Sequence, residues 1–247
     1  MPSATPSATT PPLTVVLVHG AFADASGWND VIERLFAQGL RVIAPANPLR
    51  GISIDSAYIA SVLKNVPGPV LAVGHSYGGA VITNAATYAE NVVGLVYVAA
   101  FAPNEGERLG DAESVSKDSV LSSALVPLRY PIGQGPETAV EFAIDATKFH
   151  DAFAADLPVE QTAVMAATQR PVAELAFSEP SGMPAWKNLP SWTVVATGDT
   201  AAGADVIRSM AERAGATITE VKGSHVIMMS QPQAVTDVIL NAVAALT

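Results

Sequence analysis

Apolar runs and segments of helical spacing alternate along both ends of the chain. Residues 13–18 and 70–74 are continuous apolar runs, which are typical of strands buried in a parallel sheet. From Trp28 to Phe36 the apolar residues recur every three or four positions, which predicts a helix that ends before Gly39. The complete pattern predicts strands at 13–18, 41–45, 70–74, 92–99, 193–197 and 217–221, and helices at 28–38, 56–65, 78–89, 204–214 and 232–246.

This alternation predicts an α/β fold on a mostly parallel sheet, with right-handed crossovers and helices on both faces. Residues 103–190 interrupt the pattern, because they carry Pro, Gly and two helical fragments, 139–149 and 159–168, without a strong strand pattern. We expect residues 13–102 and 191–247 to form the two parts of the core. Residues 103–190 are expected to be an inserted helical lid over the carboxyl ends of the strands, where such sheets bind ligands.

One strand-to-helix junction carries a catalytic motif. Gly74-His75-Ser76-Tyr77-Gly78 matches G-x-S-x-G and lies between a predicted strand and a predicted helix, which is the context that the motif requires. Small residues on both sides let neighbouring backbone pass close to a sharp turn, and the helix dipole favours negative charge at the serine. Ser76 is therefore the candidate nucleophile.

A serine nucleophile needs a general base, and the sequence has four histidines. His225 follows the last predicted strand, so it emerges at the carboxyl edge of the sheet and late in the chain, as the base of this motif should. His19 ends the first strand, His75 lies inside the motif with its ring expected to point away from the serine, and His150 lies in the predicted lid. We therefore expect His225 to be the base.

The acid that orients the base should follow the strand at 193–197. Asp199 does so, and its carboxylate would hydrogen-bond the imidazole, fix the tautomer and stabilise the imidazolium. Asp205 is the alternative, six residues later, at the start of a predicted helix where aspartate is also a common cap.

A tetrahedral intermediate needs backbone N–H donors for its oxyanion. Tyr77, directly after the nucleophile, supplies the first expected donor. The second is expected from the loop after His19-Gly20, where Ala21 is favoured and Phe22 comes next, since Gly20 allows a close approach.

Aromatic residues outside the predicted core are the candidate lining of a substrate pocket. Most of them lie in 103–190, and they are Phe22, Phe101, Tyr130, Phe142, Phe149, Phe153 and Trp186. Packing of the lid onto the body is the alternative role for each of them. Together they predict a pocket for an apolar small molecule, and no basic cluster indicates a phosphate or carboxylate substrate.

Composition excludes several function classes. A net charge of −10 argues against binding to nucleic acid or anionic membranes. The absence of Cys excludes disulfides, Cys-ligated metals and a Cys nucleophile. No metal cluster and no dinucleotide-binding glycine motif is visible, so we expect no metal and no cofactor. The apolar stretches are too short to cross a bilayer.

The first twelve residues are rich in Pro, Ser, Thr and Ala. Residues 1–12 lack the basic and apolar regions of a signal peptide, which predicts a flexible tail and a cytoplasmic location. The sequence leaves the oligomeric state open, a homodimer included.

Three segments, His19-Gly20-Ala21, 74–79 and Gly223-Ser224-His225, resemble the α/β-hydrolase superfamily, and the resemblance covers almost the whole chain after Pro12. Residues 224–232 are similar to the segment around the catalytic histidine of plant methylesterases and hydroxynitrile lyases. Residues 80–82 and 96–103 resemble bacterial carboxylesterases related to that group, including pyrethroid-hydrolysing ones.

The resemblance implies a triad of Ser76, Asp199 and His225, an oxyanion hole of Ala21 and Tyr77, and hydrolysis of a carboxylic ester. A lyase and a non-enzymatic ligand sensor on the same fold are the alternatives. Hydroxynitrile lyases of this group have Thr where Gly20 stands and Lys where Val226 stands, which makes the lyase the weaker hypothesis.

Overall fold

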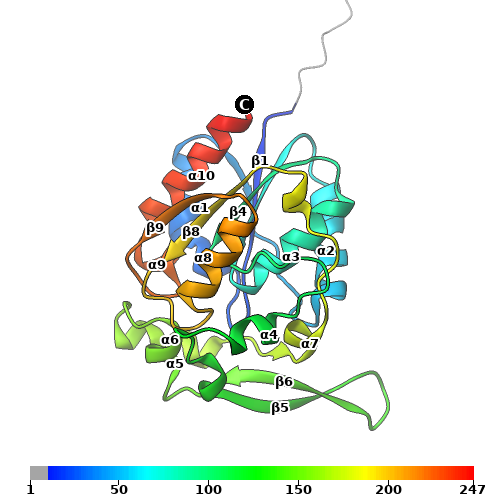
Figure 1. Ribbon diagram of the computed structural model, residues 1–247, viewed down its shortest axis with the longest axis vertical. Coiled ribbons are helices and arrows are strands. Elements are labelled where there is room, and N and C mark those ends of the chain that lie inside the picture. The colour runs from blue at the N-terminus through cyan, green and yellow to red at the C-terminus, as the bar shows by residue number, and fades with distance from the viewer. Residues whose placement is uncertain (1–10) are drawn as a thin grey trace, which may run out of the picture.

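A computed structural model describes residues 11–247, so the predicted tail at 1–12 lies almost entirely outside the described residues. Six parallel strands form the central sheet in the order β2-β1-β3-β4-β8-β9 (Figure 1). The strands are β1 (Thr14–Val18), β2 (Arg41–Ile43), β3 (Val70–His75), β4 (Val92–Val98), β8 (Ser191–Ala196) and β9 (Thr217–Val221). The inner strands β1 and β3 are buried along their whole length, which explains their uninterrupted apolar sequence.

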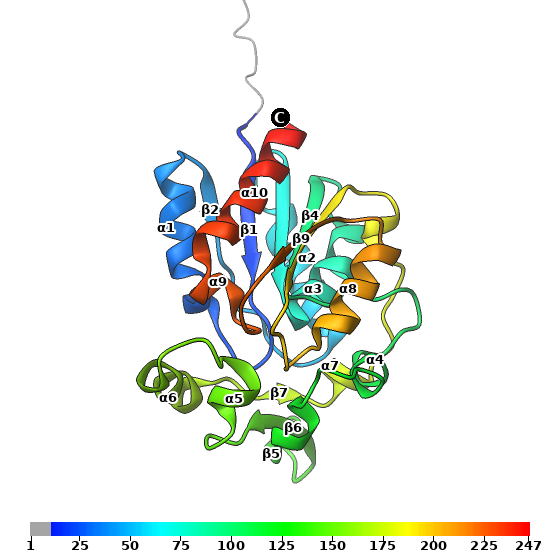
Figure 2. The same cartoon turned by 60° about the vertical axis from the view of Figure 1, so that its left-hand side comes forward.

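Helices cover both faces of this sheet. Figure 2 shows α1 and α10 on one side and α2, α3 and α8 on the other. They are α1 (Asn29–Ala37), α2 (Ile52–Lys64), α3 (Tyr77–Ala85), α8 (Ala204–Arg213) and α10 (Pro232–Leu246), with the short α9 (Ile227–Ser230) before the last. All five predicted helices are confirmed, although α2 begins four residues before the predicted start. Within residues 11–247 no helix combines the length and apolarity needed to cross a membrane.

The segment 103–190, called the insertion below, lies at the end of the sheet where the strands terminate (Figure 1). Its elements are α4 (Leu109–Ser114), β5 (Leu125–Pro131), β6 (Thr138–Ile144), α5 (Phe149–Phe153), α6 (Val159–Thr168), β7 (Val172–Ala173) and α7 (Leu175–Ser178). The predicted helix at 159–168 is confirmed to the residue.

The predicted helix at 139–149 is wrong, and the insertion is therefore not purely helical. Residues 139–144 of this range belong to β6, which pairs antiparallel with β5 and β7. The apolar side chains of Val140, Phe142 and Ile144 recur with a period of two, which is the strand period. Its partner β5 was not predicted because it contains Pro127 and Pro131, and proline disfavours a strand. Both prolines are tolerated because β5 lies at an edge of this small sheet.

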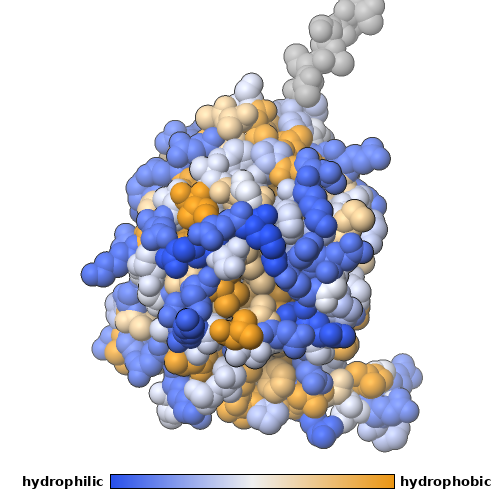
Figure 3. All heavy atoms as spheres, in the orientation of Figure 1, coloured by the Kyte–Doolittle hydropathy of each residue, from blue (hydrophilic) through white to orange (hydrophobic). Residues whose placement is uncertain are grey.

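The β5–β6 hairpin presents apolar side chains to solvent. Figure 3 shows hydrophobic residues gathered at the lower end of the molecule, where Figure 1 places this hairpin. Val126, Leu128 and Ile132 are among the exposed large side chains. In this three-stranded sheet, β5 pairs with β6 alone, and β6 also pairs with β7. The hairpin is therefore joined to the rest of the insertion through the β6–β7 pairing.

Close packing at the start of α3 makes its glycines irreplaceable. A Cβ added to Gly78 would collide with the backbone carbonyl oxygen of Val18. We predict that Gly78→Ala lowers the free energy of unfolding by about 1–3 kcal/mol or more, because rigid backbone must move apart. Urea denaturation measures this loss. The matched control is Gly135→Ala, where no atom lies within 4 Å of the added Cβ. Equal stability of the two variants would contradict the packing described.

Candidate functional site

Ser76 occupies a strained turn between β3 and α3. Its backbone has φ 53° and ψ −124°, a conformation that residues other than glycine rarely adopt. The residue is buried. A Cβ at Gly74 would lie 2.6 Å from the carbonyl oxygen of Gly78, so only glycine fits there. Main-chain N–H groups of Gly79 and Phe101 donate to the Ser76 carbonyl at 2.9 and 3.2 Å. The turn is therefore held from both sides.

The loop after β1 packs directly against this turn. A Cβ on Gly20 would lie 2.7 Å from the Cβ of Ser76, which shows how closely the loop approaches the nucleophile. Ala21 and Tyr77 are both buried next to it. Tyr77 is the first residue of α3, and the first N–H groups of a helix have no intrahelical acceptor. Among residues 11–247 the Ala21 N–H also has no backbone acceptor, so both groups are available as donors.

His225 and Asp199 form a buried pair. The Nδ1 atom of His225 lies 2.8 Å from Oδ2 of Asp199, and both side chains are almost fully inaccessible to solvent. The other carboxylate oxygen accepts the backbone N–H groups of Ala201 and Ala202 at 2.9 and 3.0 Å. The carboxylate is thus fixed by three hydrogen bonds and orients the imidazole with its Nδ1–H toward the acid.

Asp205, the alternative acid, contacts the insertion instead. Its Oδ1 accepts the Ser116 hydroxyl at 2.6 Å and its Oδ2 accepts the Lys117 N–H at 2.9 Å. The structure therefore brings Asp199 to His225, while Asp205 fixes the connection between α4 and β5.

His75, which we expected to point away from the serine, contacts the base loop. Its Nε2 lies 3.0 Å from the carbonyl oxygen of His225, and the two rings lie 4.8 Å apart between centroids. Since a carbonyl only accepts, Nε2 carries the proton, and Nδ1 is buried without a partner in the described residues. Burial, and then the charge of His225, hold the pKa of His75 well below its usual value, so the ring stays neutral.

A second neutral histidine, His19, fixes the loop after β1. His19 donates from Nδ1 to the carbonyl oxygen of Gly20 at 2.9 Å and accepts the Asn47 N–H on Nε2 at 2.9 Å. Burial lowers the pKa of His19 from 6.5 to about 4. The Asn47 side chain donates back to the His19 carbonyl at 3.0 Å. Arg170 of the insertion donates to the Asn47 carbonyl at 3.0 Å and so links the insertion to this loop.

The insertion also holds the loop that carries His225. Asp156 accepts the Ser224 N–H at 2.8 Å and the Ser224 hydroxyl on its other oxygen. Nothing in the sequence pattern pointed to Asp156, because it lies 68 residues before its partner and matches no motif.

Three of the seven candidate pocket aromatics gather beside His225. The ring of Phe153 lies 5.1 Å from His225, 5.2 Å from Phe149 and 6.1 Å from Phe22. Phe101 is buried and donates its N–H to the carbonyl of the nucleophile. These residues give the site an apolar wall.

The other candidate aromatics make contacts of their own. The Arg50 guanidinium stacks 4.5 Å from the centre of the Tyr130 ring. The Trp186 indole donates to the Pro103 carbonyl at 3.1 Å, which joins the two ends of the insertion. Phe142 packs against Phe177 inside the insertion, with ring centroids 6.4 Å apart. A pocket role for Tyr130 and Trp186 stays a prediction.

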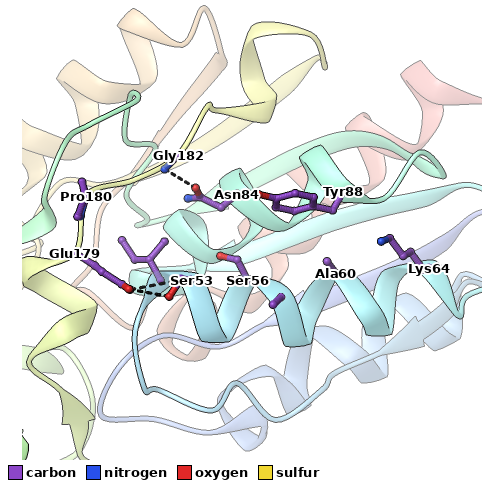
Figure 4. Close-up of a pocket in the computed structure, with 11 residues that line it drawn as sticks. Ser53, Ser56, Ala60, Lys64, Asn84, Tyr88, Glu179, Pro180 and Gly182 are labelled. Carbon is purple, nitrogen blue, oxygen red and sulfur yellow. Dashed lines mark hydrogen bonds between the residues drawn. The ribbon is translucent and has the colours of Figure 1, made fainter.

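A groove of about 540 Å³ lies between α2 and residues 179–182 (Figure 4). Figure 4 shows Glu179 bonded to Ser53 and Asn84 bonded to the Gly182 N–H across it. Ser76, His225 and Asp199 do not line this groove. Because these two bonded pairs each join the body to the insertion, the groove is a seam between them. Within residues 11–247 no three His, Asp or Glu side chains come together to hold a metal ion.

Comparison with known proteins identifies the family of the chain. The sequence profile of the Alpha/beta hydrolase family matches residues 15–238. A carbendazim hydrolyzing esterase of Nocardioides sp. (strain SG-4G) is 35% identical over 107 residues, which cover 38% of this chain and 44% of that protein. The chain thus spans less than half the length of this curated relative.

Solved structures of similar fold cover nearly the whole chain. Polyneuridine aldehyde esterase has a TM-score of 0.78 at 20% identity, over 94% of this chain and 99% of that one. A pyrethroid hydrolase from Sphingobium faniae JZ-2 has a TM-score of 0.75 at 21% identity, over 94% and 98%. The likeness confirms the predicted fold.

The buried neutral histidines predict an acid-sensitive fold. Between pH 6.5 and about 4 the unfolded chain binds a proton at His19 and the folded chain does not, so protonation favours unfolding. We expect the free energy of unfolding to fall by up to about 3 kcal/mol from this group as pH drops through that window. The pKa of His75 is also lowered by burial, so its protonation likewise favours unfolding as pH drops.

Urea denaturation between pH 4.5 and 7 measures this dependence. His19→Gln should flatten the slope, while His150→Gln, a control at a partly exposed ring, should keep the wild-type slope. Identical slopes in wild type and His19→Gln would refute the assignment.

Proposed function

Because the chain belongs to the alpha/beta hydrolase family, we propose that it hydrolyses carboxylic esters by way of a covalent acyl-enzyme on Ser76. The observation that carries this proposal is the buried 2.8 Å hydrogen bond between His225 and Asp199 at the edge of the sheet where the Ser76 turn lies. The curated relative that matches part of the chain is described as an esterase, which supports the same reaction class.

In the first half of the reaction, Ser76 Oγ attacks the ester carbonyl while Nε2 of His225 accepts the hydroxyl proton. The carbonyl π electrons move to oxygen, and the N–H groups of Ala21 and Tyr77 stabilise the oxyanion. His225 then gives its proton to the leaving alcohol as the ester C–O bond breaks. The acyl group remains on Ser76.

In the second half, water attacks the acyl-enzyme with His225 again accepting the proton. Collapse of the intermediate returns that proton to Ser76 and releases the carboxylic acid. Asp199 stays ionised throughout and stabilises the imidazolium that forms in each half. The aromatic residues Phe22, Phe149 and Phe153 beside His225 support a small to medium apolar ester as the substrate class.

Hydrolysis of a chain-length series of p-nitrophenyl esters tests this proposal. We expect Ser76→Ala and Asp199→Asn each to lower kcat by about 10⁴-fold, since one removes the nucleophile and the other the correct tautomer of the base. Asp205→Asn is the matched control and should keep kcat within about threefold, because its carboxylate binds Ser116 and not the base. Circular dichroism confirms that each variant is folded.

Two results would overturn the proposal. One is a folded wild type that turns over no ester of any chain length. The other is a Ser76→Ala protein that retains wild-type turnover.

A further inference from the structure

A crevice of about 40 Å³ lies between the loop after β1, helix α6 of the insertion and the segment that follows His225. Figure 2 shows α6 below α9, the helix of that segment. The crevice has residues in common with the candidate site, because Phe22, next to the expected oxyanion donor Ala21, and Val226, next to His225, both line it. Its volume admits little more than one small group, since a water molecule occupies about 30 Å³ in the liquid.

The wall of the crevice is mostly apolar. Three of its residues are methionines, whose flexible side chains adapt to partners of different shape: Met165, Met228 and Met229. The polar side chains at its edge are engaged by backbone. Asp24 accepts an N–H at 2.7 Å, while Thr168 and Gln169 each donate to a carbonyl at 2.9 Å. The crevice is therefore suited to a hydrocarbon group and not to a charged one.

The ring of Phe22 belongs both to the crevice and to the surroundings of His225. It lines the crevice, and it packs edge-on against the ring of Phe153 at 6.1 Å, which in turn lies 5.1 Å from the His225 ring. Phe22 is buried, and its backbone has φ 59°, which is a marked outlier for a bulky side chain. The surrounding structure thus holds this ring in place at a cost in backbone strain, as is typical of residues at functional sites.

We propose that Phe22 determines substrate length, because its ring closes the space beside His225 against the crevice and so limits the apolar chain of the ester to a short one. The inference rests on the proposed ester hydrolysis. Removal of the ring joins the two spaces. A longer chain that starts at Ser76 then buries its last methylene groups where the ring and the crevice were.

Two series of esters measure this limit: p-nitrophenyl esters of linear acids and acetate esters of linear alcohols, each with chains from butyl to decyl length. In at least one series we expect the wild type to have the higher kcat/KM for the butyl chain. Phe22→Ala should raise the decyl-to-butyl ratio of kcat/KM about tenfold in that series, because further methylene groups become buried. Adding Met165→Trp to this variant should return the ratio close to the wild-type value, because the indole fills the crevice from α6.

Phe36→Ala is the matched control. It removes the same ring from α1 at a side chain that is 57% exposed, so the ratio should stay at the wild-type value. Phe22→Leu, which keeps an apolar side chain in the loop, should raise the ratio about threefold and replaces the alanine variant if that variant does not fold.

Four results would overturn the role of Phe22. The first is a wild type that favours the decyl chain in both series. The second is an unchanged ratio in both series for the folded Phe22 variants. The third is a ratio that stays raised after Met165→Trp is added, since the chain then lies outside the crevice. The fourth is an equal rise in Phe36→Ala.

Calorimetric titration with ketones separates failure of this inference from failure of the proposed hydrolysis. Methyl propyl ketone and methyl nonyl ketone carry the carbonyl and the chain of an ester but cannot be hydrolysed. In the Ser76→Ala background, a preference for the longer ketone that increases with Phe22→Ala and is lost with Met165→Trp supports the length limit whether or not esters are turned over. Turnover of butyl-length esters, with ester ratios and ketone preference both unaffected by Phe22→Ala, would leave the hydrolysis intact and refute the role of Phe22.

Discussion

The steric constraint at the turn between β3 and α3 is the feature on which the rest of the site depends. Ser76 adopts a positive φ of 53°, and the glycines around it leave no room for a Cβ. Because Gly20 and Gly78 both pack against backbone or Cβ atoms of neighbouring segments, Ser76, α3 and the loop after β1 form one rigid unit. The strain of roughly 1–3 kcal/mol at such a residue is tolerated only because this packing fixes it.

Two buried neutral histidines extend that rigidity to the pair of His225 and Asp199. His75, adjacent to the nucleophile, hydrogen-bonds the His225 carbonyl, and His19 hydrogen-bonds the Gly20 carbonyl. Both rings are protonated on a single nitrogen, so each acts as a fixed donor and brings no charge into the site. The insertion contributes from the other side, where Asp156 holds Ser224. The positions of Ser76 and His225 that hydrolysis would require are thus fixed by His19, His75 and Asp156, which take no part in proton transfer.

The sequence was sufficient for the parts of the molecule that follow local rules. Buried apolar strands, helix spacing and G-x-S-x-G are local patterns, so the parallel sheet and Ser76 could be predicted. Strand β6 could not, because its partner β5 contains prolines and the apolar residues of its seven-residue segment fit both the helical and the strand period. The contacts of His75 and Asp156 depend on segments 150 and 68 residues away, and no spacing rule signals such pairs. The sequence favoured Asp199 over Asp205 because Asp199 directly follows the strand, and in space Asp199 meets His225 while Asp205 meets Ser116.

Activation of Ser76 by His225 is the central claim, and covalent labelling tests it most directly. Intact-protein mass spectrometry after reaction with diethyl p-nitrophenyl phosphate should reveal one diethylphosphoryl group per chain, mapped by peptide analysis to Ser76. The labelling rate should fall by at least about 100-fold in His225→Ala, because the hydroxyl then lacks its base. Labelling of a different residue, or an unchanged rate in a folded His225→Ala protein, would contradict the account.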